Sequence, residues 1–153
     1  MKTVTFCGHR DIIPDERVRS LLHEAIEAEI QNGAEQFYVG GRGEFDSMAA
    51  AAVRAAKRRH RDKIVQLYLV EPYMREGINR DRSYYESLYD GIIIPQELLG
   101  VHPKAAIIMR NRWMIQKADC LIAFVQRDFG GAYQTLNYAM KKGIRIINLA
   151  ENK

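Results

Sequence analysis

Strand-like and helix-like segments alternate along this chain of 153 residues, and no other feature of the sequence constrains the fold as strongly. Short runs rich in β-branched and aromatic residues predict strands at residues 3–6, 37–39, 64–70, 91–94, 121–125 and 144–149. Between them, apolar residues at helical spacing predict helices that start near Pro14, Phe45, Pro103 and Ala132. Strands joined through helices of this length form parallel sheets with helices on both faces. We therefore expect a single α/β domain over residues 1–153, a Rossmann-like three-layer sandwich with a mostly parallel sheet.

The stretch from Glu71 to Gly91 does not follow this alternation, and we expect it to be irregular. It is rich in tyrosine and arginine. Its aromatic residues, and the apolar ones that follow as far as Leu99, have no evident core role in the predicted fold. They are therefore candidates for the surface of a homodimer.

The composition excludes several classes of protein. Hydrophobic residues make up 47% of the chain and charged residues 27%, a balance typical of globular chains rather than disordered ones. The apolar runs are far shorter than the ~18 residues of a membrane helix, and the first residues turn polar too early for a signal peptide. The two cysteines, Cys7 and Cys120, have no metal-ligand spacing. We expect a cytoplasmic protein with no membrane partner, no metal site and no resident cofactor.

The net charge of +4 comes from one stretch, residues 54–63, which carries six basic residues and one acidic residue. Cations at the end of a helix complement its dipole and usually form a solvated face, which is the favoured interpretation. The same run is also suited to bind phosphate or nucleic acid, and the sequence leaves both possibilities open.

Three loops that follow predicted strands are candidates for a binding site, because ligands of open α/β sheets bind at the carboxyl ends of the strands. The first loop holds Gly8, His9 and Arg10. The glycine permits close approach of a ligand, and the arginine can pair with a phosphate. The alternative is a plain turn whose histidine and arginine point into solvent.

The second loop places Gly40, Gly41 and Gly43 just before Asp46. Backbone N–H groups of such a loop, at the start of a helix, favour an anion. The spacing matches neither the dinucleotide-binding fingerprint nor the P-loop. Asp46 either caps its own helix or accepts a hydrogen bond from a ribose hydroxyl.

The third loop repeats this arrangement with Gly130, Gly131 and Thr135, whose hydroxyl adds a donor in the first helical turn. A glycine turn without a binding role is the alternative. If the three loops converge, Gly8, Gly41 and Gly131 should line one pocket.

Asn111 interrupts an apolar helical stripe formed by Ile107, Met114 and Ala118, and Arg110 stands beside it. A buried amide without partners costs ~1–3 kcal/mol, so Asn111 either bonds a neighbouring loop or lines the site. We expect Arg110 and Asn111 to point into the cleft or directly beneath it.

These residues resemble the YpsA-like family of the SLOG superfamily, which also contains the lonely-guy phosphoribohydrolases and the nucleic-acid-binding core of DprA. The resemblance rests on GHR after the first strand, GGRGEFDSMAAAAV after the second, RNRWMIQKADCLIAFV, and FGGAYQTLNYAMKKGIRIINL. It covers nearly the whole chain in the same order and is weakest between residues 71 and 100. It implies a Rossmann-like fold and a nucleotide or ADP-ribose-like ligand held in the cleft between the glycine loops.

The lonely-guy enzymes carry a PGGxGTxxE motif whose glutamate, with an upstream arginine, serves cleavage of the N-glycosidic bond. Here Phe129 replaces the proline, one residue is inserted before Thr135 and no carboxylate follows, although Arg110 matches the region of the arginine. Because this cleavage needs a general acid or base, we expect a ligand-binding protein rather than an enzyme. A nucleotide hydrolase, with Asp46 or Glu44 in place of the missing carboxylate, and a nucleic-acid-binding protein are the alternatives.

Overall fold

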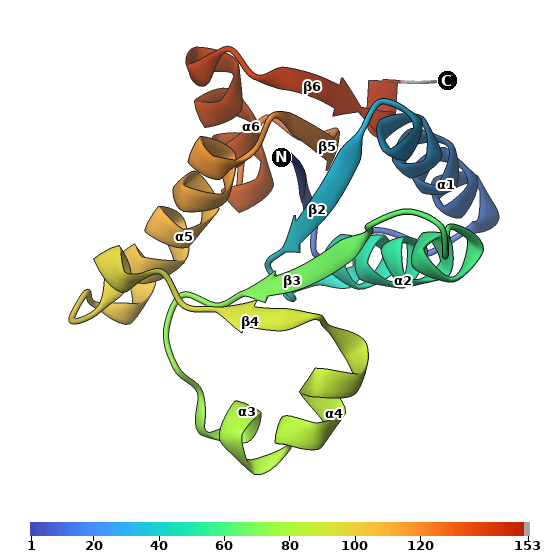
Figure 1. Ribbon diagram of the computed structural model, residues 1–153. Coiled ribbons are helices and arrows are strands. Elements are labelled where there is room, and N and C mark those ends of the chain that lie inside the picture. Colours follow the sequence, from blue (N-terminus) through green and yellow to red (C-terminus); the bar gives the residue numbers. More distant parts are fainter. Residues whose placement is uncertain (152–153) are drawn as a thin grey trace.

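A computed structural model describes residues 1–151 and contains a six-stranded sheet in which every neighbouring pair of strands is parallel (Figure 1). The strands are β1 (Lys2–Gly8), β2 (Ala34–Val39), β3 (Gln66–Val70), β4 (Gly91–Ile93), β5 (Cys120–Phe124) and β6 (Arg145–Asn148). Their order across the sheet is β4-β3-β2-β1-β5-β6. The expected Rossmann-like α/β fold is confirmed.

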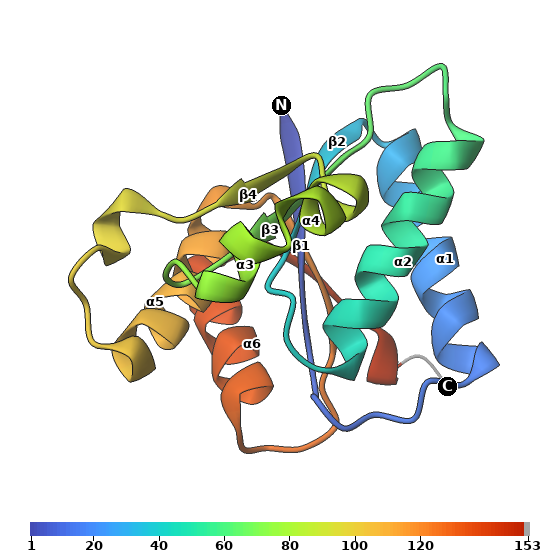
Figure 2. The same cartoon turned by 90° about the horizontal axis from the view of Figure 1, so that it is seen from below.

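Helices α1 (Glu16–Gln31) and α2 (Glu44–Arg59) cover one face of the sheet, and α5 (Pro103–Lys117) and α6 (Gly131–Lys142) cover the other (Figures 1 and 2). The main core lies on the side of α1 and α2, where Phe6, Phe37 and Phe45 are at most 2% exposed. Alternation along the strands sends other apolar residues, such as Leu121, to the opposite face. Both faces of the sheet are therefore buried, as parallel sheets require.

The segment predicted to be irregular contains two short helices, α3 (Glu76–Arg80) and α4 (Arg82–Leu88), which lie beyond the edge strand β4 (Figure 1). Tyr85, Tyr89 and Ile92 pack against the main core. The expectation of no core role is therefore wrong for Tyr85 and Tyr89, whereas Tyr84 and Leu99 are 61% and 69% exposed. The homodimer surface expected in this stretch stays a prediction. Two 3₁₀ turns, η1 (Gln96–Leu98) and η2 (Leu149–Glu151), complete the fold.

Within residues 1–151, no helix combines the length and the apolar character needed to cross a membrane.

The order of the strands determines where a ligand can bind. Strand β1 pairs with β2 on one side and with β5 on the other, so the chain reverses its direction of progress across the sheet at β1. Loops that leave β1 and β5 at the carboxyl edge diverge to opposite faces and leave a crevice between them. The three candidate loops follow β1, β2 and β5 and meet at this edge.

Candidate ligand-binding cleft

Two adjoining cavities lie at the carboxyl edge of the sheet. The inner cavity has a volume of about 260 Å³ and the outer cavity about 410 Å³. Gly8, Arg10, Gly131 and Ala132 line both cavities, so the two form one cleft.

Most of the residues selected from the sequence meet at this cleft. The inner cavity is lined by Gly8, Arg10, Asp46, Arg110, Asn111, Gly131 and Thr135, and the outer cavity also contacts His9 and Gly130. Gly40, Gly41 and Gly43 line neither cavity, so the expectation that Gly41 shares a pocket with Gly8 and Gly131 is wrong. The second loop reaches the cleft through Arg42 and Asp46 instead.

The glycines of the second loop allow close packing within the protein. Gly43 has a φ of 89°, and a Cβ there would lie 2.8 Å from the Cα of Arg10. The backbone N–H of Glu44, the first residue of α2, donates to the carbonyl of Arg10 at 3.0 Å. The first loop therefore packs against the N-terminus of α2, and the first N–H of the expected anion site is already bonded to the protein's own backbone.

The N-terminus of α6 is open in contrast. Gly130 precedes the helix with a φ of 91°, no side chain caps the first turn, and a Cβ added at Gly130 or Gly131 would meet nothing within 4 Å. The first N–H groups of a helix have no acceptor within it and carry the positive end of its dipole. Thr135 is not a free donor, because its hydroxyl donates to the carbonyl of Gly131 at 3.0 Å. The open backbone N–H groups face the cleft beside Arg10.

Asp46 is not the N-cap of α2, as one interpretation of the sequence expected; that position is held by Gly43. Asp46 lies in the first turn, and its Oδ2 accepts a hydrogen bond from the backbone N–H of Arg42 at 3.2 Å. Burial raises the pKa of Asp46 to about 6, against the opposing effects of that N–H and the Arg110 guanidinium. A carboxyl group facing the inner cavity thus exchanges its proton close to neutral pH.

Arg110 and Asn111 both line the inner cavity, as expected. Arg110 is 3% exposed, and its Nη1 donates to the carbonyls of Gly40 at 3.1 Å and Val70 at 2.8 Å. Its Nε donates to Oδ1 of Asn111 at 2.9 Å. Arg110 therefore ties the ends of β2 and β3 to α5, and burial lowers its pKa.

His9 connects the first loop to the loop after β5. It is 6% exposed, and its Nε2 accepts hydrogen bonds from the backbone N–H groups of Gln126 at 2.9 Å and Arg127 at 3.2 Å. This pairing requires a neutral ring with the proton on Nδ1. Burial, and secondarily Arg127, lower the pKa of His9, so the plain solvent-exposed turn is excluded for this residue.

Sequence reasoning missed Glu71, which is fully buried immediately after β3. Arg75 holds it with two hydrogen bonds, of 3.0 and 2.9 Å, and Nη2 of Arg42 lies 3.9 Å from its Oε2. The guanidinium carbon of Arg42 lies 5.8 Å from the centre of the Tyr73 ring. The sequence could have indicated Glu71, because it directly follows a buried strand. The three loops were selected by the same rule, that ligands bind at the carboxyl ends of the strands.

The open sheet and the cleft at its switch point define a Rossmann-like protein. No protein-family model and no curated protein matches the chain. Similar solved structures include the structural-genomics target TM1055 (TM-score 0.63, 15% identity, covering 95% of this chain and 72% of that one). DNA processing protein A from Helicobacter pylori, described as binding single-stranded DNA, gives a TM-score of 0.64 at 18% identity, with coverage of 95% and 63%. The Moco carrier protein of Chlamydomonas rheinhardtii gives 0.56 at 14% identity, with coverage of 97% and 76%.

At these identities the similarity shows the fold alone. The chain spans 63% of the length of the Helicobacter protein.

Proposed function

We propose that this protein binds a nucleotide or a nucleotide derivative, such as an ADP-ribose-like molecule, in the cleft at the carboxyl edge. The proposal rests on one observation. The open N-terminus of α6 adjoins the inner cavity, which is lined by the carboxyl group of Asp46 and the amide of Asn111. Cavities of this size fall near the ~300–1,000 Å³ range of small-molecule sites.

The outer cavity is suited to the phosphate end of the ligand. The free N–H groups at Gly131 and Ala132 favour an anion, and the helix dipole adds to this preference. Arg10 is exposed at the mouth of the cleft, where a guanidinium group can form paired hydrogen bonds with phosphate. Negative charge on the ligand is therefore expected here rather than at the closed start of α2.

The inner cavity is suited to the ribose and base. Asp46 offers an acceptor for ribose hydroxyls, and the amide of Asn111 faces the same space. Tyr73, whose ring centre lies 5.8 Å from the guanidinium carbon of the cleft residue Arg42, is our candidate from the middle segment for contacting the base. A nucleoside would thus replace solvent around groups that the protein already holds in place.

A second candidate function is hydrolysis of the N-glycosidic bond, favoured by one observation. A pKa of about 6 lets Asp46 supply or accept a proton near neutral pH, which such a cleavage needs. Release of free base from nucleoside monophosphates, lost in Asp46→Asn, would place this activity first. We expect binding without base release.

Thermal-shift and calorimetric titrations with AMP, NAD, ADP-ribose and cyclic dinucleotides test the proposal. A ligand present at 100 times its Kd should stabilise the fold by about 2.7 kcal/mol, with one molecule bound per chain. Arg10→Ala and Asp46→Ala should weaken binding. Arg19→Ala, which removes the same charge from an exposed pair on α1, should not. Absence of stabilisation by every one of these compounds would overturn the proposal.

A further inference from the structure

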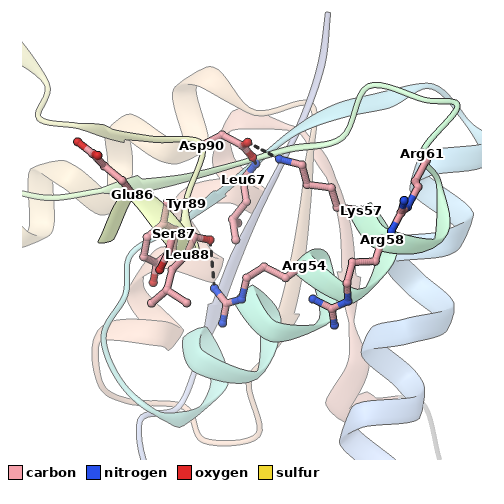
Figure 3. Close-up of a pocket in the computed structure, with 10 residues that line it drawn as sticks. All are labelled: Arg54, Lys57, Arg58, Arg61, Leu67, Glu86, Ser87, Leu88, Tyr89 and Asp90. Carbon is pink, nitrogen blue, oxygen red and sulfur yellow. Dashed lines mark hydrogen bonds and ion pairs between the residues drawn. The ribbon is translucent and has the colours of Figure 1, made fainter. Parts of the chain in front are cut away.

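A third cavity, of about 410 Å³, lies at the opposite end of α2 from the cleft (Figure 3). We call it the basic pocket. One wall consists of Arg54, Lys57, Arg58 and Arg61, and the other of residues 86–90, with Leu67 between them. About 12 helical residues, or roughly 18 Å, separate Asp46 from Arg58. The basic pocket is therefore a separate site from the cleft.

The basic run divides between two faces of α2. On the face toward α1, Arg59 donates to Oε1 of Glu27 and His60 bonds the other oxygen of the same carboxylate. On the other side, four cations of the run line the basic pocket, and Lys63 does not. A uniformly solvated face, the interpretation favoured by the sequence, does not describe this arrangement.

Two cations of the basic pocket are already engaged. Lys57 pairs with Asp90, whose other oxygen accepts the backbone N–H of Leu67 at 2.8 Å. Arg54 donates to the carbonyl of Leu88 at 3.4 Å and lies over the Tyr89 ring. These contacts fix two positive groups against the wall of the pocket.

The other two cations are uncommitted. Arg58 and Arg61 are exposed, and within residues 1–151 neither side chain has a hydrogen bond or an ion pair. Glu86, the remaining acidic residue of the lining, lies near Arg82. Its carboxylate points away from the arginine side chains of the pocket (Figure 3). The pocket therefore carries an excess of positive charge that no acidic side chain of its lining neutralises.

The α4 wall adds an aromatic surface. Tyr84 is 61% exposed, and it precedes the pocket residues Ser87 and Leu88 by three and four positions, so all three share one side of the helix. The Ser87 hydroxyl donates to the carbonyl of Tyr84 at 2.6 Å. The α4 wall of the pocket, opposite the free guanidinium groups of Arg58 and Arg61, thus has an exposed tyrosine within one helical turn, which offers a stacking surface near the phosphate binders.

We propose that the basic pocket binds the sugar–phosphate backbone of single-stranded nucleic acid, with Tyr84 stacking on a base. Guanidinium groups match phosphate geometry, and only an unpaired strand presents base faces to an exposed ring. This binding is independent of the ligand in the cleft.

Fluorescence anisotropy with a labelled oligothymidylate of about 12 nucleotides tests the proposal. The double variant Arg58→Ala/Arg61→Ala should reduce the salt slope of log K by about 1.4, because each phosphate contact with a single strand contributes ~0.7. Tyr84→Ala should weaken binding on the order of tenfold. It should not change binding of an abasic strand of the same length. Because the three side chains are exposed, all variants are expected to melt as the parent does.

A matched control is Lys141→Ala/Lys142→Ala, which removes two charges from the end of α6. It should leave the salt slope unchanged. Equal losses in the control and in the pocket variant would show binding by overall charge and overturn the proposal. Parent-like binding by Arg58→Ala/Arg61→Ala would also overturn it, as would a preference for duplex over single strands.

Discussion

The two glycine-rich loops that open α2 and α6 look alike in the sequence but differ in the structure. Both place a glycine with positive φ, Gly43 or Gly130, directly before the helix. At α2 the space that a side chain would fill is taken by Arg10, and the first N–H of the helix is bonded to that residue's carbonyl. At α6 the same space is empty.

A glycine can thus be required before a helix for two opposite reasons. In the second loop it lets two segments of the protein touch, whereas in the third it leaves backbone N–H groups accessible. Side-chain hydrogen bonds also hold the second loop in place. Asp46 accepts from the backbone N–H of Arg42, and Arg110 donates to the carbonyl of Gly40. The loop before α2 therefore has a structural role, and we propose a binding role for the loop before α6.

Alanine substitution of one glycine from each loop should give the largest contrast. Gly43→Ala combines left-handed strain of ~1–2 kcal/mol with overpacking of ~1–3 kcal/mol, so the free energy of unfolding should fall by about 2–5 kcal/mol. Gly131 is helical and faces open space, so Gly131→Ala should change that free energy by less than about 1 kcal/mol. Urea denaturation measures both. A Gly43→Ala protein as stable as the parent would show that the loop before α2 does not depend on close packing at Gly43.

Two of the arginines that line the cleft, Arg110 and Arg10, should differ in the same way, with a smaller effect. Arg110→Ala leaves two buried carbonyls without their donor, so we expect a loss of about 2–3 kcal/mol of unfolding free energy. Arg10→Ala should alter stability by no more than about 0.5 kcal/mol and act on ligand binding. Thermal melting measures both variants. Equal destabilisation would argue against a structural role for Arg110 and a binding role for Arg10.

The smallest effect expected is that of acid on His9, which bonds the loop before α6, and on Asp46, which bonds the loop before α2; the two should respond with opposite signs. The pKa of His9 is lowered in the folded protein, so the unfolded chain binds the proton first. The contribution of His9 to stability is complete above its ordinary pKa of 6.5 and declines as the pH falls below it. The pKa of Asp46 is raised from 3.8 to about 6, so its contribution is present at low pH and is lost as the pH rises through 6.

Urea midpoints between pH 5 and 8 should therefore show a steeper acid loss in Asp46→Asn and a shallower one in His9→Gln. An identical pH profile in the parent and both variants would contradict the assigned pKa directions.

The fold could be predicted because strand and helix periodicities are local properties of the sequence. The convergence of Gly8, Arg10, Asp46 and Gly131 followed from a general rule about the carboxyl edge of parallel sheets. The closed state of the second loop could not be predicted, because it depends on Arg10, more than 30 residues away along the chain. The pairing of Glu71 with Arg42, and the pocket that Arg58 shares with residues 86–90, also depend on tertiary structure, and no periodicity encodes them.

We propose that the start of α6 receives the phosphate of the ligand and that the start of α2 does not. Backbone amide NMR shifts during titration with ADP-ribose, compared with adenosine, test it directly. We expect phosphate-dependent shifts at the N–H groups of Gly131 and Ala132 and little change at Gly43 and Glu44. Shifts concentrated at Gly43 and Glu44, with Gly131 and Ala132 unaffected, would contradict it.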